Sequence, residues 1–173
     1  MKRQDRVCII LDLVKALKNN GSWCGETHVQ KATYFLQVLA RVPLDYDFIL
    51  YKHGPFSFDL RDELTAMRAD ELLGRQSFYP FGSSLSVSEA GEHICSFRSD
   101  TVKKYRDKVN CVAETLGGKG VVDLERLATA LYVTQEMIES SNDERARYIH
   151  RIKPHISELQ ALKDLDEIFK LKM

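Results

Sequence analysis

The chain has 173 residues, 44% of them hydrophobic, which is enough to build a globular fold with a core of its own. It carries 25 lysines and arginines against 25 aspartates and glutamates, so it has no net charge to attract a polyanion. Sequence-independent affinity for nucleic acid comes mainly from neutralised phosphates, and this balance therefore argues against a general nucleic-acid-binding protein.

The first two predicted elements are helices. Residues 5–18 repeat apolar side chains at helical spacing, and the run 19–22, Asn-Asn-Gly-Ser, ends that helix. A capping box is predicted at residues 27–30, with Thr27 serving the amide of Gln30 and the Gln30 side chain reaching back. The helix that it opens is expected to run to about Arg41, before Pro43.

A short aromatic segment with a glycine–proline pair comes next. Residues 47–51 are rich in aromatic and branched side chains and predict a strand. Gly54-Pro55 predicts a rigid turn, because proline fixes φ and glycine tolerates positive φ. Ser57 is placed to cap a helix over about residues 57–70.

The pieces at residues 76–80 and 84–87 are β-prone and predict a hairpin around Phe81-Gly82. The run 88–91, Ser-Glu-Ala-Gly, predicts a return into a short helix. The order helix, helix, strand, helix and hairpin is that of a winged helix-turn-helix. We therefore expect a winged-helix-like region over residues 1–98.

The pattern is helical from residue 100 onward. Two helices are predicted over residues 100–116 and 123–138. Ser141 and Ser157 each begin capping-box spacing and open two more helices. Residues 99–173 are thus expected to form a helical bundle packed on the N-terminal half as one compact unit, and the fold class is mainly α (α+β).

We find no motif for catalysis, a cofactor or a metal. The run 117–120, Gly-Gly-Lys-Gly, lacks the strand and the serine or threonine of a P-loop. None of the five histidines forms an HExxH motif. His53, Ser57 and Asp59 lie too close in the chain for a usual triad. The sequence therefore predicts a protein that is not an enzyme, with no cofactor, no catalytic residue and no metal ligand.

The cysteines stand at positions 8, 24, 95 and 111 without a CxxC pair and are interpreted as structural free thiols. Asp12 interrupts the apolar run that a signal peptide would need. No run approaches the roughly 18 apolar residues of a membrane span. We expect a cytoplasmic protein that does not contact a membrane.

A winged-helix order keeps DNA binding open as an alternative. The helix over residues 57–70 would hold the recognition position. Its charged side chains are two cations and four anions: Arg61, Arg68, Asp59, Asp62, Glu63 and Asp70. Positive charge gathers in a later helix, which gives a candidate nucleic-acid patch of Lys103, Lys104, Arg106 and Lys108. These charges favour a protein partner over DNA.

Two motifs resemble those of the bacterial Panacea antitoxin-type domains. One is the run 30–37, Gln-Lys-Ala-Thr-Tyr-Phe-Leu-Gln, and the other is the run 51–57, Tyr-Lys-His-Gly-Pro-Phe-Ser, followed by Asp59-Leu60. The resemblance is closer still to a branch of small uncharacterised bacterial proteins related to that family. Residues 127–132 and 152–157 also look like that branch, so the resemblance spans about residues 26–160.

The resemblance implies a non-enzymatic antitoxin-like or regulatory adaptor that binds a toxin or presents a client to degradation machinery. The candidate partner-binding residues are Tyr51, Lys52, His53, Phe56 and Arg61. The aromatic members also fit a role in the core, and both roles stay open. The alternative function is a winged-helix DNA-binding transcriptional regulator.

Overall fold

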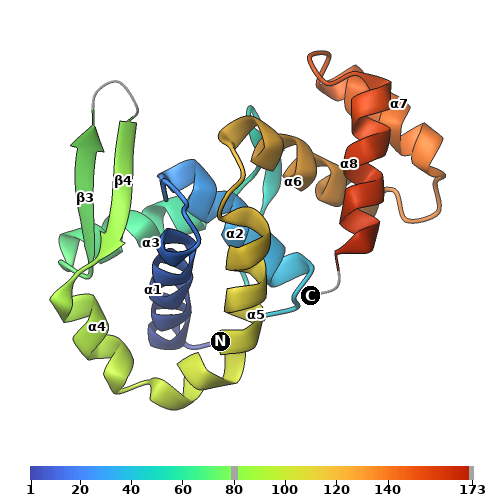
Figure 1. Cartoon of the computed structure of the whole chain (residues 1–173). Helices are drawn as coiled ribbons and strands as arrows, with labels where there is room; N and C mark the ends of the chain where they lie inside the picture. Colours follow the sequence, from blue (N-terminus) through green and yellow to red (C-terminus); the bar gives the residue numbers. More distant parts are fainter. Residues whose placement is uncertain (79–81, 172–173) are drawn as a thin grey trace. The chain divides into compact units, whose positions relative to one another are not determined.

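The computed structural model describes residues 1–78 and 82–171 (Figure 1). The prediction of a mainly α fold with a small β component is confirmed, since helices dominate and the described strands form two antiparallel hairpins. The chain divides into two compact units. Among the described residues, unit 1 contains residues 1–48 and 57–119, and unit 2 contains residues 49–56 and 120–171.

Unit 1 contains the predicted helices and the later hairpin, whereas the strand predicted between the second and third helices belongs to unit 2. Its elements are α1 (Arg3–Asn19), α2 (Glu26–Val38), α3 (Phe58–Ala69), β3 (Leu73–Phe78), β4 (Gly82–Val87), α4 (Glu89–Ser96) and α5 (Ser99–Leu116). The predicted hairpin turn around Phe81-Gly82 involves Phe81, which lies outside the described residues. The helix α5, which follows the predicted boundary at residues 98 and 99, packs along α1 and belongs to unit 1 (Figure 1).

The helix α1 lies at the centre of unit 1. It contacts α2, α4, α5 and β4, and Ile9, Ile10 and Leu13 are fully buried. The apolar spacing had indicated one buried face, whereas the structure buries nearly the whole middle of the helix. Neighbours on several sides explain the difference, because a helix that is apolar around most of its circumference needs more than one packing partner.

The predicted capping box at the start of α2 is wrong. Gly25 is the N-cap residue, without a side-chain cap, and Thr27 lies inside the helix. The Gln30 side chain is fully buried and turns instead to the main chain of Ser57. Its Nε2 donates to the Ser57 carbonyl oxygen at 2.9 Å, and its Oε1 accepts from the Ser57 amide at 3.0 Å. A buried amide side chain is most stable where both of its polar ends are paired, and the main chain of Ser57 supplies both partners.

Gln37, two helical turns further along α2, makes the same type of contact. Its Nε2 donates to the Tyr46 carbonyl oxygen at 2.8 Å, and its Oε1 accepts from the Tyr46 amide at 2.9 Å. One side of α2 therefore fixes two points of the chain that follows it. The helix ends at Val38, a little before the predicted end at about Arg41.

Side-chain caps start the next two helices of unit 1. The Ser57 hydroxyl accepts from the Leu60 amide at 3.2 Å, which confirms the predicted cap of α3. The Ser88 hydroxyl accepts from the Gly91 amide at 3.0 Å at the start of α4. Between these helices, β3 and β4 pair in antiparallel register from Leu73–Val87 to Phe78–Gly82.

His28 is a buried histidine of unit 1 whose environment disfavours its charged form. Burial lowers its pKa, while a contact of its Nε2 with the Leu116 carbonyl oxygen at 3.1 Å acts in the opposite direction. Because only N–H can donate to that carbonyl, the neutral ring carries its proton on Nε2.

We expect the free energy of unfolding to fall as the pH drops below about 6.5, because the unfolded chain then takes up a proton at His28 that the folded chain resists. The loss from this group amounts to at most about 1.4 kcal/mol per pH unit. Urea unfolding between pH 5 and pH 8 measures it, with His28→Gln as the comparison, since glutamine can still donate to Leu116. If the free energy of unfolding of His28→Gln fell with decreasing pH as steeply as that of the wild-type protein, this assignment would be contradicted.

The described residues of unit 2 form a hairpin and three helices. Its elements are β1 (Ile49–Tyr51), β2 (Gly54–Phe56), α6 (Val121–Glu136), α7 (Asn142–Ile152) and α8 (Glu158–Lys170). The hairpin packs on α6, and α8 packs on both α6 and α7. The predicted capping box of Ser141 and Glu144 is present at α7, and the Ser157 hydroxyl caps α8 by accepting from the Gln160 amide at 3.2 Å. No helix within residues 1–78 and 82–171 is long and apolar enough to cross a bilayer.

Candidate functional site

The hairpin of unit 2 contains most of the residues that the sequence nominated for partner binding. Tyr51 pairs with Gly54 across a turn made of Lys52 and His53. The prediction that Gly54-Pro55 forms the turn is therefore wrong, because both residues belong to β2. Proline is tolerated there since each strand of a two-stranded hairpin is an edge strand. Gly54 has a φ of +82°, a conformation that favours glycine at the end of the turn.

A buried lysine side chain donates hydrogen bonds to the main chain of this turn. Lys153 directly follows α7, and its side chain is only 8% exposed. Its ammonium donates to the Tyr51 carbonyl oxygen at 3.0 Å and to the Lys52 carbonyl oxygen. A third contact reaches Oε1 of Glu125 at 3.3 Å. An ammonium has three N–H donors, so these contacts use all of its hydrogen-bonding capacity.

Glu125, on α6, is the anion of the cluster, and its side chain is 11% exposed. Two imidazoles flank its carboxylate. His53 approaches Oε2 through Nδ1 at 3.4 Å, and His155 approaches Oε1 through Nε2 at 3.4 Å. Both imidazoles are largely exposed, whereas the carboxylate and the ammonium beneath them are not. The site thus consists of a buried ion pair, Lys153 and Glu125, and two exposed histidines that contact its carboxylate.

An open cavity of about 670 Å³ lies over this cluster. Its lining is drawn from the hairpin, from α6 and from the segment after α7: Leu50, Tyr51, Lys52, His53, Glu125, Ile152, Lys153, Pro154 and His155. Tyr51 is 53% exposed, and its ring centroid lies 5.8 Å from that of the half-buried Phe56. The hairpin therefore presents an aromatic face next to polar and basic groups.

This arrangement is suited to recognition of another chain. An exposed tyrosine supplies apolar contact area with few rotatable bonds and keeps a polar hydroxyl. Lys52 and the two imidazoles add hydrogen-bond donors for acidic or carbonyl groups of a partner. The buried Lys153 holds the turn in one conformation before any partner arrives, and such preorganisation lowers the entropic cost of binding.

Within the described residues of the structure, no group of three or more His, Cys, Asp or Glu side chains is arranged to hold a metal ion. The cluster of Glu125, His53 and His155 is included in that result.

Four of the five predicted partner-binding residues, Tyr51, Lys52, His53 and Phe56, come together on the hairpin. The fifth, Arg61, belongs to unit 1 on α3. Its guanidinium pairs with Asp62 at 2.9 Å and lies over the ring of Phe58, 5.0 Å from the centroid. Of the two aromatic candidates, Tyr51 is exposed, whereas Phe56 is half-buried.

The four residues of the candidate nucleic-acid patch lie on α5. Two of them are engaged within unit 1: Arg106 pairs with Asp12 at 3.3 Å, and Lys108 donates to the Ala40 carbonyl oxygen at 2.7 Å. Lys104 lies 5.1 Å from the ring centroid of Tyr105, and Lys103 is exposed. Lys108 would have to give up its carbonyl contact in order to neutralise phosphate, and the charge of Arg106 is already partly offset by Asp12.

The exposed side of α3 is acidic, as its sequence indicated. Asp59, Asp62 and Asp70 are exposed, whereas Glu63 is buried and pairs with Arg3 at 2.7 Å. Arg61 is paired locally with Asp62. A helix with this charge distribution would repel the phosphates that flank a DNA groove.

Sequence reasoning missed three members of the site, namely Glu125, Lys153 and His155. A signal for Glu125 did exist. It precedes Ala128, Thr129 and Tyr132 by three, four and seven residues, the spacing of one helix face. Glu125 therefore lies on the same side of α6 as residues of its predicted apolar face. A carboxylate on such a face predicts a buried anion that needs a cation. The identity of that cation depends on tertiary structure.

Comparison with protein-family models and with curated proteins gave no match for this chain.

Proposed function

We propose that the protein is a non-enzymatic protein-interaction module that works in the cytoplasm as an antitoxin-like or regulatory adaptor. It binds a protein partner through the β1–β2 hairpin. The observation that carries this proposal is the exposed Tyr51–His53 turn, whose carbonyl oxygens are held by the buried ammonium of Lys153. The acidic exposed side of α3 supports a protein partner over DNA.

The partner surface that fits this site is acidic or rich in carbonyl groups and carries one apolar side chain. Lys52 and Lys153 contribute two positive charges to the lining and Glu125 contributes one negative charge. The lining is therefore net positive even with neutral histidines. The exposed ring of Tyr51 would contact the apolar side chain, and the donors around it would pair with the acidic groups.

The double variant Tyr51→Ala/His53→Ala is expected to weaken partner binding about 30-fold, the effect of losing a hot spot worth about 2 kcal/mol. The full-length tagged protein is used to isolate a partner from its host, and the Kd of the purified pair is then measured by calorimetry. His93→Ala/Phe97→Ala is the matched control, because it removes an exposed histidine–aromatic pair of unit 1 with ring centroids 4.9 Å apart.

Equal losses in the hairpin variant and the control would contradict the assignment of the hairpin as the binding surface. Recovery of DNA as the dominant bound species, with affinity falling steeply as salt rises, would overturn the proposed function itself. Growth arrest by the isolated partner, relieved by co-expression of this protein, would identify the antitoxin form of the proposal.

A further inference from the structure

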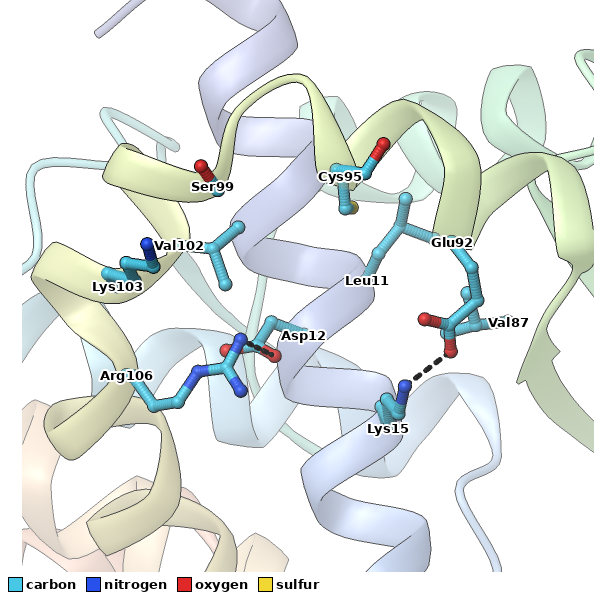
Figure 2. Close-up of a pocket in the computed structure, with 11 residues that line it drawn as sticks. Leu11, Asp12, Lys15, Val87, Glu92, Cys95, Ser99, Val102, Lys103 and Arg106 are labelled. Atoms are coloured by element: carbon cyan, nitrogen blue, oxygen red, sulfur yellow. Dashed lines mark hydrogen bonds and ion pairs between the residues drawn. The ribbon is translucent and has the colours of Figure 1, made fainter.

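A second cavity, of about 260 Å³, lies within unit 1 (Figure 2). It is bounded by α1, α4 and α5 and by the end of β4: Leu11, Asp12, Lys15, Val87, Glu92, Cys95, Ser96, Ser99, Val102, Lys103 and Arg106. Pockets for drug-sized molecules measure roughly 300–1,000 Å³. This cavity lies just below that range and therefore suits a smaller ligand. Its wall combines a buried apolar floor of Leu11 and Val102 with several charged side chains.

Two ion pairs cross the wall of this cavity. Arg106 on α5 pairs with Asp12 on α1 at 3.3 Å, and Lys15 on α1 pairs with Glu92 on α4 at 2.6 Å (Figure 2). The second pair is half exposed at both ends, whereas the Asp12 side chain is only 14% exposed. Asp12 is thus the least exposed charged group of these two pairs.

The Asp12 carboxylate has more acceptor capacity than its surroundings use. A carboxylate offers about four lone-pair sites. Within the described part of the chain, Asp12 accepts no hydrogen bond, and the Arg106 guanidinium at 3.3 Å is its ion-pair partner. Burial raises its pKa, and Arg106 and Lys15 only partly offset that rise. Such an anion has room for a further cationic donor.

Lys103 supplies a positive charge at the same cavity. It is exposed, lines the same cavity, and lies one helical turn before Arg106 on α5. Its ammonium has no ion pair or hydrogen bond among residues 1–78 and 82–171. The cavity is therefore lined by a carboxylate with free acceptor sites, Asp12, and by an ammonium without a partner among the described residues, Lys103. Its floor is apolar.

We propose that this cavity binds a free α-amino acid with an apolar side chain. The ligand ammonium donates to Asp12, and the ligand carboxylate accepts from Lys103 and from the free N–H groups of Arg106. Its side chain packs on Leu11 and Val102. A guanidinium has five N–H donors, so Arg106 can bind the ligand without leaving Asp12. This inference concerns unit 1 alone and stands independently of the partner proposed for the hairpin.

The test is a titration of the ¹⁵N-labelled full-length protein with leucine, followed by amide chemical shifts. Two compounds serve as probes of the two charges: 4-methylpentanoate lacks the amine of leucine, and 3-methylbutylamine lacks its carboxylate. We expect saturable shifts with leucine at Leu11, Glu92 and Val102. Each probe should bind at least about tenfold more weakly, since each loses one charged hydrogen-bonding group.

Lys103→Met should weaken leucine binding about tenfold and leave the affinity for 3-methylbutylamine unchanged. Lys104→Met is the control, because it removes the neighbouring lysine, which is absent from the cavity lining. The absence of saturable shifts with leucine up to about 10 mM would overturn the proposal. Equal affinity for leucine and 4-methylpentanoate, or equal effects of the two lysine variants, would overturn it as well.

Discussion

Gln30→Met is expected to lower the free energy of unfolding by about 2–3 kcal/mol, although methionine has nearly the volume of glutamine. The Gln30 amide pairs with both main-chain polar groups of Ser57, and both residues are fully buried. The Ser57 carbonyl oxygen keeps a second partner in the Arg61 amide at 3.1 Å. The Ser57 amide would have none, and an unpaired buried amide accounts for most of the expected loss.

Urea unfolding measures this effect, and the single tryptophan of the chain, Trp23, is a convenient probe because it belongs to unit 1 together with Gln30. The urea concentration at the midpoint of unfolding should fall, while the slope of the free energy of unfolding against urea concentration stays the same. Gln37→Met is the matched control. It removes the same type of amide contact, to Tyr46, from a less buried position, and should cost about 1 kcal/mol.

A Gln30→Met variant whose free energy of unfolding lies within about 0.5 kcal/mol of the wild-type value would contradict this assignment. Equal losses for Gln30→Met and Gln37→Met would also contradict it, because the argument depends on the difference in burial. Hydrogen exchange at the Ser57 amide provides a second measurement. Exchange there should become faster in Gln30→Met and stay unchanged in Gln37→Met.

The sequence predicted the helices well because their signals are local. The caps of Ser57 and Ser141 lie within three residues of the amides that they satisfy, so spacing alone identifies them. Thr27 and Gln30 have the same spacing and form no cap. The Gln30 side chain is recruited by Ser57, 27 residues further along the chain, and a local pattern cannot reveal that competition.

The hairpin shows a similar limit. Gly54 and Pro55 are strong turn residues, yet the register of β1 and β2 places the turn two residues earlier, at Lys52 and His53. A glycine at the end of a turn and one within it give the same local signal. The prediction therefore identified the segment that changes direction and located its turn incorrectly.

The candidate site was predictable only in part. Tyr51, Lys52 and His53 were nominated because they lie in one unusual run. The groups that hold and flank them, Glu125 and Lys153, are more than 70 residues away in the sequence. Helical periodicity marks faces of α6 and α7 but does not state which loop a face will contact. A buried ion pair between distant elements is a property of the tertiary structure.

Lys153→Met is expected to have the largest effect in unit 2, a loss of about 3–5 kcal/mol. The variant would leave the Glu125 carboxylate buried without its ammonium partner and would remove the donor from the Tyr51 and Lys52 carbonyl oxygens. Removal of one member of a buried ion pair costs more than the pair contributes, because the remaining charge has no compensation.

Hydrogen exchange followed by mass spectrometry locates this effect, since peptides from β1, β2 and α6 should exchange faster. Lys163→Met is the control, because Lys163 is an exposed lysine of α8 in the same unit. It should change the free energy of unfolding by less than about 0.5 kcal/mol. Loss of partner binding should accompany Lys153→Met even at temperatures where the variant remains folded, because the turn loses its fixed conformation.

The double variant Lys153→Met/Glu125→Gln distinguishes a buried charge from simple loss of packing. It no longer leaves an isolated carboxylate, so it should be more stable than Lys153→Met alone by at least about 1 kcal/mol. A double variant that is less stable than Lys153→Met would mean that Glu125 contributes through other contacts. Lys153 would then hold the turn through the two carbonyl oxygens, and the ion pair would not be the reason for its burial.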